Sequence, residues 1–150
     1  MTNQDYEYRG LLAETWDLFR GDTSTWEDKF FYEKIIQEYG QPVLDVGCGT
    51  GRLLLDYLSQ GIEIDGLDNS PEMFMICQKK AFELGLKPNL IELGMENLDV
   101  KRKYRTIIVP SLSFQLVVDE NLALKTIQLF YYHLEVDGAL VMPFIIFWEN

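Results

Sequence analysis

The sequence has few basic residues and no long apolar run. Its 13 Lys and Arg stand against 24 Asp and Glu, which gives a formal net charge of −11. An excess of negative charge repels phosphate backbones and anionic lipid surfaces. The short basic cluster at 101–103 lies between apolar runs and is interpreted as a solvated turn. No segment approaches the ~18 apolar residues that a membrane-spanning helix needs. The composition therefore argues against a nucleic-acid or membrane partner.

Cysteine and histidine are also scarce. Cys48 and Cys77 form neither a C-x-x-C pair nor a Cys/His metal spacing, so we expect reduced thiols and no metal site. His133 falls late in an expected helix, where its charged form would favour the helix C-terminus, and it is not a candidate base. The polar, acidic start of the sequence lacks a secretory signal pattern. We therefore expect a cytoplasmic protein.

Two helical segments are expected before residue 41. In the first, apolar residues recur at three- and four-residue spacing, at Leu11, Leu12, Trp16 and Phe19. In the second, one apolar face is expected at Phe31, Ile35 and Tyr39. Ser24 or Thr25 would cap this second helix, because an acid follows each of them three residues later. Gly40 and Pro42 end the segment.

From residue 42 onward, short apolar strands alternate with amphipathic helices. This order is typical of a parallel sheet covered by helices. The expected strands are 43–46, 62–67, 89–92, 106–109 and 139–142 with an extension to 147, and the expected helices are 52–60, 70–84 and 119–134. The helix start at Ser70 is the clearest, because Pro71 and an acid follow the capping hydroxyl. A chain of 150 residues with 47% hydrophobic content is long enough for one compact α/β domain.

The strongest motif is a strand that runs into a glycine-rich turn, Val43-Leu44-Asp45-Val46-Gly47-Cys48-Gly49-Thr50-Gly51. Glycines lack Cβ, so the backbone can turn sharply and approach a ligand closely. In an open parallel sheet, ligands bind beyond the carboxyl ends of the strands. The spacing is G-x-G-x-G, and Arg52 stands where a dinucleotide fingerprint has its third glycine. The motif therefore predicts a ligand loop and argues against NAD.

Asp68 ends the next expected strand, near the ~20-residue separation at which an acid reaches a ribose. A carboxylate at that place can accept hydrogen bonds from both ribose hydroxyls. Taken alone, the glycine turn could be only a tight connection, and Asp68 could be only a neighbour of the cap at Ser70. Together they favour a nucleoside-like ligand.

The segment 43–51, Asp68 and the helix start Ser70-Pro71-Glu72-Met73 resemble the class I S-adenosylmethionine-dependent methyltransferases. The resemblance extends over 41–144 and implies a Rossmann-like, doubly wound α/β core over 41–150 with S-adenosylmethionine as cofactor. The leading helices resemble the cap of small bacterial members, which assigns a cap to 1–40. The family usually has seven strands with a final antiparallel hairpin, whereas five are expected here. The last strand would then have a bare edge, so either a second chain pairs with it as a homo-oligomer or the chain is part of a longer protein.

The resemblance also implies cofactor contacts for the strand ends. Asp45 would order the loop and meet the methionine ammonium through the loop or water. Gly47 and Gly49 would line the methionine and ribose, and Asp68 would bind the ribose hydroxyls. Asn69 and Met73 would lie beside the adenine. Gly94 stands where many relatives have an acid. The full set implied is Asp45, Gly47, Cys48, Gly49, Gly51, Asp68, Asn69, Met73, Gly94, Met95, Glu96, Pro110 and Ser111.

No catalytic residue is assigned, because methyl transfer depends on alignment and dehydration more than on an acid–base triad. If the acceptor must lose a proton, Asp5, Glu7, a tyrosine or water could take it. The early aromatic residues are interpreted as the interior of the cap, although aromatic faces also attract a sulfonium: Tyr6, Tyr8, Trp16, Trp26 and Phe31. The acidic composition favours a small-molecule methyl acceptor. The rival hypotheses are an NAD-dependent oxidoreductase and a non-catalytic module that binds the cofactor or pairs through its edge.

Overall fold

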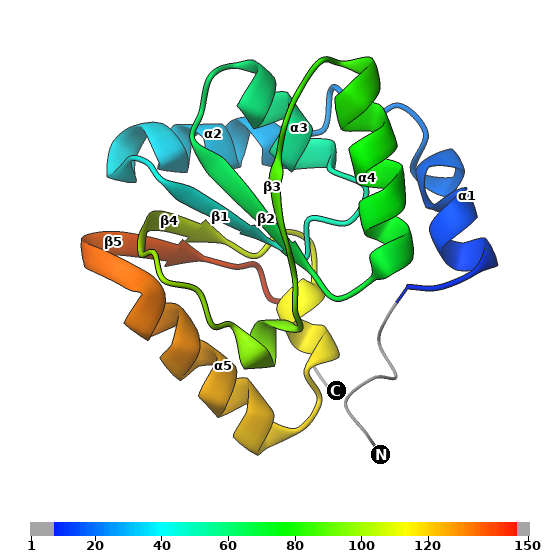
Figure 1. Ribbon diagram of the computed structural model, residues 1–150. Helices are drawn as coiled ribbons and strands as arrows, with labels where there is room; N and C mark the ends of the chain where they lie inside the picture. Colours follow the sequence, from blue (N-terminus) through cyan, green and yellow to red (C-terminus); the bar gives the residue numbers. More distant parts are fainter. Residues whose placement is uncertain (1–7, 147–150) are drawn as a thin grey trace.

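The computed structural model describes residues 8–146, which form one five-stranded sheet (Figure 1). The strands are β1 (Val43–Val46), β2 (Ile64–Asp68), β3 (Asn89–Glu92), β4 (Tyr104–Ile108) and β5 (Leu134–Val141). They lie in the order β3-β2-β1-β4-β5, and every pairing is parallel. The order of the strands reverses beside β1, which places a binding crevice beyond its carboxyl end. The expected fold class is confirmed.

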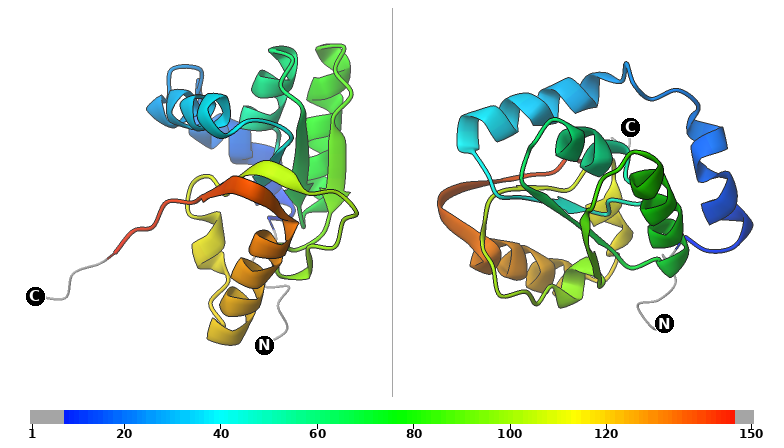
Figure 2. Two further views of the ribbon diagram at one scale, coloured as in Figure 1. Left: turned by 90° about the vertical axis from the view of Figure 1, so that its left-hand side faces the viewer. Right: turned by 45° about the horizontal axis from the view of Figure 1, so that its top comes forward.

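Helices cover both faces of the sheet (Figures 1 and 2). One face carries α2 (Glu27–Tyr39), α3 (Arg52–Ser59) and α4 (Pro71–Glu83), and the other carries α5 (Glu120–His133). Short 3-10 turns follow β3 and β4 at Met95–Asn97 and Ser113–Leu116. Each face has its own apolar cluster, so the sheet is the middle layer of three.

Strand β1 shows how the sequence divides between these clusters. Val43 packs with the α2, α3 and α4 side chains, whereas Leu44 and Val46 pack with α5. Successive side chains of a strand point to opposite faces, so a strand buried on both sides must be apolar throughout. All four residues of β1 are buried, including Asp45. A carboxyl at this place is therefore the exception that needs a separate explanation.

Helix α1 (Leu11–Arg20) lies apart from the sheet, beside α4 (Figure 2). Ala13 is its buried side chain, whereas Leu11, Leu12 and Phe19 are exposed. Apolar spacing thus correctly predicted a helix but not the packing of its apolar face. The structure brings α1 to the carboxyl ends of the strands and α2 against the sheet. The division into a cap over 1–40 and a core over 41–150 remains a prediction.

Two details of α2 differ from the prediction. The helix begins at Glu27 after Trp26, and no side chain caps it. The Ser24 backbone N–H instead donates to Asp22 Oδ1 at 2.9 Å, so Ser24 belongs to the preceding turn. The buried face contains Tyr32 and Ile36, which is one residue beyond the expected face. Three aromatic residues stand in a row at 30–32, so spacing alone could not select the inward one.

Strand β5 begins directly after α5, five residues earlier than expected. Its register with β4 jumps, because Leu134 lies opposite Tyr104 and Ala139 lies opposite Thr106. The added stretch contains Asp137 with φ 61° and Gly138, where a Cβ would lie 2.9 Å from two backbone carbonyl oxygens. The strand ends at Val141, so the predicted extension toward residue 147 is wrong for residues 142–146. Residue 147 lies outside the described part.

Within residues 8–146 every strand pair is parallel. Its helices are all too short or too polar to cross a membrane.

Candidate functional site

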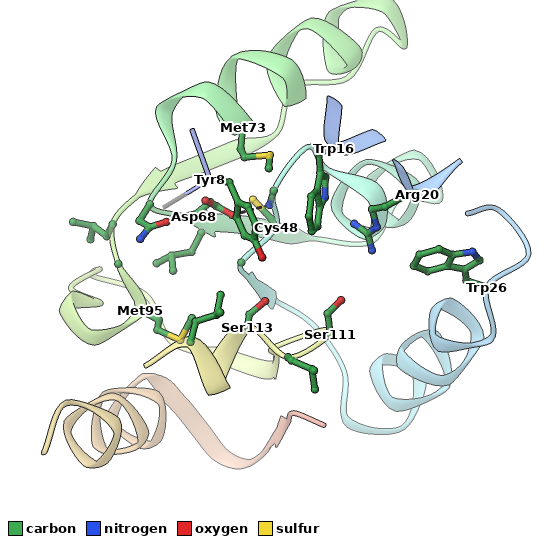
Figure 3. Close-up of a pocket in the computed structure, with 18 residues that line it drawn as sticks. Tyr8, Trp16, Arg20, Trp26, Cys48, Asp68, Met73, Met95, Ser111 and Ser113 are labelled. Carbon is green, nitrogen blue, oxygen red and sulfur yellow. Dashed lines mark hydrogen bonds between the residues drawn. The ribbon is translucent and has the colours of Figure 1, made fainter. Parts of the chain in front are cut away.

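A cavity of about 350 Å³ opens beyond the carboxyl ends of β1 and β2 (Figure 3). This volume lies in the range of small-molecule sites. The wall is assembled from the glycine loop, the end of β2, the segments after β3 and β4, and the first helices. It consists of Tyr8, Trp16, Arg20, Trp26, Gly47, Cys48, Gly49, Leu67, Asp68, Asn69, Met73, Leu93, Gly94, Met95, Ser111, Leu112, Ser113 and Leu116.

The loop between β1 and α3 exposes its backbone to this cavity. The N–H groups of Gly47 and Cys48 both donate to the Leu67 carbonyl, at 2.7 and 3.0 Å, which ties the loop to β2. Gly47 has φ 72°, and a Cβ there would lie 2.8 Å from Ser113 Oγ. Gly49 has φ 54°, and a Cβ there would enter open space. Glycine therefore lets the chain turn at both places and keeps the space beside Gly49 open for a ligand.

Asp68 is held at the cavity wall by two backbone donors. Its Oδ2 accepts a hydrogen bond from the Gly49 N–H at 2.8 Å, and its Oδ1 accepts one from the Ser70 N–H at 2.9 Å. The Asp68 residue is 7% exposed. These two bonds fix the orientation of the carboxylate at the cavity wall. Ser70 caps α4 as predicted, because its Oγ accepts from the Met73 N–H at 3.2 Å.

Asp45 is buried and does not belong to the cavity wall. Its Oδ1 has no hydrogen-bond partner within residues 8–146. Burial raises the pKa of this carboxyl to about 7, although the nearby Arg52 guanidinium opposes the shift, and the Asp68 charge adds to it. Burial also raises the pKa of the Cys48 thiol well above its usual value. Asp45 and Cys48 are therefore poor candidates for permanently charged ligands of a substrate.

The structure gathers most of the expected site residues around this cavity. Those in its wall are Gly47, Cys48, Gly49, Asp68, Asn69, Met73, Gly94, Met95 and Ser111. Four others are buried outside the wall: Asp45, Gly51, Glu96 and Pro110. Their contact with a cofactor, like that of the residues in the wall, remains a prediction.

Packing explains why Gly51 and Glu96 lie outside the wall. At Gly51 a Cβ would lie 2.7 Å from Cys77 Sγ and 2.8 Å from Leu55 Cγ, so this glycine lets α3 and α4 approach. At Gly94 a Cβ would lie 2.5 Å from Glu96 Oε1. The Glu96 carboxylate therefore occupies the place that a side chain at 94 would take, and it lies behind the cavity wall.

Sequence reasoning misassigned the early aromatic residues. Tyr8, Trp16 and Trp26 line the cavity rather than the interior of a cap, whereas Phe31 is 53% exposed and Tyr6 lies outside the described residues. The Tyr8 and Trp16 ring centroids are 4.7 Å apart. Arg20 also lines the cavity, and it lies four residues after Trp16 on the same helix face. That spacing was the available signal. The remaining wall residues Leu67, Leu93, Leu112, Ser113 and Leu116 carried no motif.

Polar links hold α1 over the cavity. Thr50 Oγ1 donates to Asp17 Oδ1 at 2.7 Å, and Lys80 Nζ lies 2.5 Å from Asp17 Oδ2. The Ser70 hydroxyl donates to the Tyr8 carbonyl. These contacts connect α1 with both the glycine loop and α4. They place Trp16 and Arg20 at the mouth of the sheet.

The comparisons with known proteins agree with this geometry. The family model described as a methyltransferase domain matches residues 43–138. A glycine/sarcosine/dimethylglycine N-methyltransferase from Actinopolyspora halophila is 31% identical over 150 residues, which cover 91% of this chain and 25% of the relative. A putative methyltransferase from Geobacillus sp. is 28% identical over 115 residues, which cover 74% of this chain and 47% of the relative.

A solved S-adenosylmethionine-dependent methyltransferase from Clostridium acetobutylicum superposes with a TM-score of 0.70 at 26% identity. The match covers 86% of this chain and 54% of that protein. The chain thus spans about half of the length of this neighbour, and half or less of the two curated relatives.

Proposed function

The chain belongs to the methyltransferase domain family, and on that premise we propose that its cavity binds S-adenosylmethionine for methyl transfer to a small-molecule acceptor. One observation carries the proposal: the buried Asp68 carboxylate lines the cavity and is fixed by the N–H groups of Gly49 and Ser70. A nucleoside needs such an acceptor for its two ribose hydroxyls. The glycine loop beside it leaves room for the rest of the ligand.

The wall residues fit the parts of this cofactor. Met73, Leu93 and Met95 give an apolar surface for a flat base near Asp68. The loop at 47–49 approaches with backbone only, which suits the ribose and the chain that leads to the sulfur. The cavity volume of about 350 Å³ is large enough for a ligand of nucleoside size. We therefore assign the adenosyl group to the end of the cavity that contains Asp68.

When bound, S-adenosylmethionine supplies a methyl group on a sulfonium that transfers by in-line displacement. The chain contributes alignment, through the Asp68 carboxylate and the loop, and exclusion of water, through the aromatic faces of Tyr8, Trp16 and Trp26. Such faces stabilise a nearby cation by about 0.5–2 kcal/mol. No base is assigned to the wall.

A small-molecule acceptor is supported by the printed activity of the relative from Actinopolyspora halophila, a glycine/sarcosine/dimethylglycine N-methyltransferase. The formal charge of −11 points the same way, since it disfavours nucleic acid. The NAD-dependent alternative is disfavoured because Arg52, at the place of the third fingerprint glycine, begins α3 and pairs with Asp28 through two hydrogen bonds. A non-catalytic module would show binding without turnover.

Titration calorimetry with S-adenosylhomocysteine and NAD tests the proposal. We expect the wild type to bind S-adenosylhomocysteine and not NAD. Asp68→Asn retains one acceptor oxygen for the loop but loses the charge, and it should weaken binding by tenfold or more, since each hydrogen bond to a charged group contributes about 1.5–3 kcal/mol. Asp99→Asn is the matched control, because Asp99 is exposed and outside the cavity wall. Equal affinity in wild type and Asp68→Asn would refute the site.

Three further expectations belong to this proposal. Two free, buried cysteines fit a reducing compartment, so we place the protein in the cytoplasm. Residues 1–40 act as the cap and 41–150 as the core.

The outer edge of β5, which has no partner strand within residues 8–146, pairs with a second copy. Light scattering at several concentrations tests the pairing, and a monomer throughout would exclude it.

A further inference from the structure

One segment of the cavity wall is attached to the rest of the protein by a single polar side chain. This floor segment, residues 110–117, follows β4 and contributes Ser111, Leu112, Ser113 and Leu116 to the wall. Figure 3 shows its two serines across the cavity from Trp16. The floor segment therefore forms the side of the cavity that faces helix α1.

The floor segment needs support, because its backbone is strained and its own hydrogen bonds are local. Ser111 has φ 58°, a left-handed conformation that a residue other than glycine keeps only where the surrounding structure enforces it. The hydrogen bonds inside the segment join residues three apart, as from the Ser113 hydroxyl to the Pro110 carbonyl at 3.0 Å. These bonds shape the turn, but they do not attach it to the sheet.

The side chain of Gln115 supplies the attachment. Its Nε2 donates to the Ile145 carbonyl at 3.1 Å, and its Oε1 accepts from the Ile145 N–H at 2.9 Å. Within residues 8–146 these are the hydrogen bonds that join the floor segment to other parts of the chain. The Phe114 and Phe144 rings add an edge contact, with centroids 5.8 Å apart. A side-chain amide has both donors and an acceptor, so Gln115 binds both backbone groups of Ile145 as a neighbouring strand would.

This clamp also determines how the floor segment meets the glycine loop. The two are in contact at Ser113, because a Cβ at Gly47 would lie 2.8 Å from Ser113 Oγ. Ser113 is two residues from Gln115, in the same 3-10 turn. Gly47 also lines the cavity, so a shift of the turn would move the floor and change the space beside the loop.

We infer that Gln115 is a positioning residue for the cavity. By clamping Ile145 it holds Ser113 against Gly47, and so it fixes the floor along which the sulfur-bearing chain of the ligand lies. The inference rests on the proposed function and gives a role to a side chain outside the wall. Without the clamp, only a fraction of the molecules would have the floor in its binding conformation, and the apparent affinity would fall by that fraction. The adenosine part of the ligand, assigned to the end with Asp68, would be affected less.

Calorimetry with S-adenosylhomocysteine and adenosine tests the inference, because adenosine lacks the sulfur-bearing chain. Gln115→Met has a similar length and removes both hydrogen bonds, whereas Gln115→Glu retains the acceptor for the Ile145 N–H. Gln128→Met is the matched control, since Gln128 is exposed on α5 and outside the cavity wall. Hydrogen exchange of the free proteins follows the peptides that contain 110–117 and 142–146. Urea denaturation measures the free energy of unfolding of each variant.

The expected result is a selective loss of affinity. Gln115→Met should weaken S-adenosylhomocysteine about tenfold, which corresponds to about 1.4 kcal/mol, through the loss of two hydrogen bonds. Adenosine should bind nearly as before, and Gln115→Glu should fall between Gln115→Met and the wild type. Both peptides should exchange faster in Gln115→Met. The control should match the wild type in every measurement.

A purely structural role for Gln115 would give a different result. The inference fails if Gln115→Met lowers stability but leaves the ratio of the two affinities unchanged, or if the 110–117 peptide exchanges as in the wild type. If the wild type binds neither ligand, the proposed function fails separately. In that case the exchange of the two peptides still decides whether Gln115 holds the floor segment in place.

Discussion

The two walls of the cavity are built in different ways. The strand wall presents backbone and one buried carboxylate, through Gly47, Gly49 and Asp68, and the parallel register of β1 and β2 holds it. The helix wall presents long side chains, above all Trp16 and Arg20, from a helix whose own apolar residues are largely exposed. The strand wall is supported by the core of the sheet, whereas the helix wall depends on a few polar links. Substitutions in the first should therefore change stability and binding together, and those in the second mainly binding.

Two glycines of the β1–α3 loop, Gly49 in the strand wall and Gly51 behind it, provide the sharpest test. Gly51→Ala should lower the free energy of unfolding by about 3 kcal/mol, because it combines a left-handed φ of 89° with clashes against Cys77 and Leu55. Gly49→Ala has the strain without the clash and should cost about 1 kcal/mol, but its Cβ would enter space beside the ligand and weaken binding. Urea denaturation and calorimetry measure the two effects. Equal losses of stability would contradict the distinction.

Asp45, buried behind the strand wall, makes the stability of the protein sensitive to pH. Its pKa is raised from 3.8 to about 7 by burial, so the folded protein holds a proton that the unfolded chain has released between about pH 4 and pH 7. Stability should therefore fall as the pH rises through this window, on the order of 4 kcal/mol for about three pH units at about 1.4 kcal/mol per unit. Asp45→Asn should remove most of this dependence. Parallel pH profiles for the two proteins in urea denaturation would show that Asp45 is not the group responsible.

On the helix wall, Trp16→Ala should affect binding more than stability. The substitution removes the tilted ring contact with Tyr8 and one of the two rings at Arg20. We expect about tenfold weaker binding of S-adenosylhomocysteine, and a loss of less than 1 kcal/mol in unfolding free energy because the helix is mostly exposed. Trp16→Phe should retain most of the affinity. A large drop in stability with unchanged affinity would place Trp16 in a structural role instead.

Asp17→Asn should have the smallest effect. Burial raises the pKa of Asp17, but hydrogen bonds from Lys80 and Thr50 outweigh it and lower the pKa overall. The contact therefore stabilises above the ordinary pKa of an aspartate and is lost as the pH falls through the lowered value. Because both partners are partly exposed, we expect Asp17→Asn to lower the free energy of unfolding by about 0.5 kcal/mol at pH 7. Lys80→Met should reproduce it, and a double variant no worse than either single one would confirm the coupling. Strictly additive losses would contradict it.

The strand wall could be predicted from sequence because its residues lie within fixed motifs. The glycine turn, the acid at the end of β2 and the cap at Ser70 follow from local chemistry, and the parallel sheet brings the ends of its strands together. The helix wall could not be placed this way. Helical spacing identified α1, but its position depends on contacts between Asp17, Thr50 and Lys80, which are far apart in the sequence.

The sequence by itself thus determined the order of the elements, the parallel α/β class and the loop whose bare backbone faces a ligand, since each depends on neighbouring residues. Only the tertiary structure decided which side chains meet across the cavity. In the structure Asp45 and Gly51 are buried outside the cavity wall. The early aromatic residues Tyr8, Trp16 and Trp26 line the cavity together with Arg20. The physical reason is that burial and pairing of charges are set by distance in space, and they change when a helix face turns by one residue or a strand begins five residues earlier.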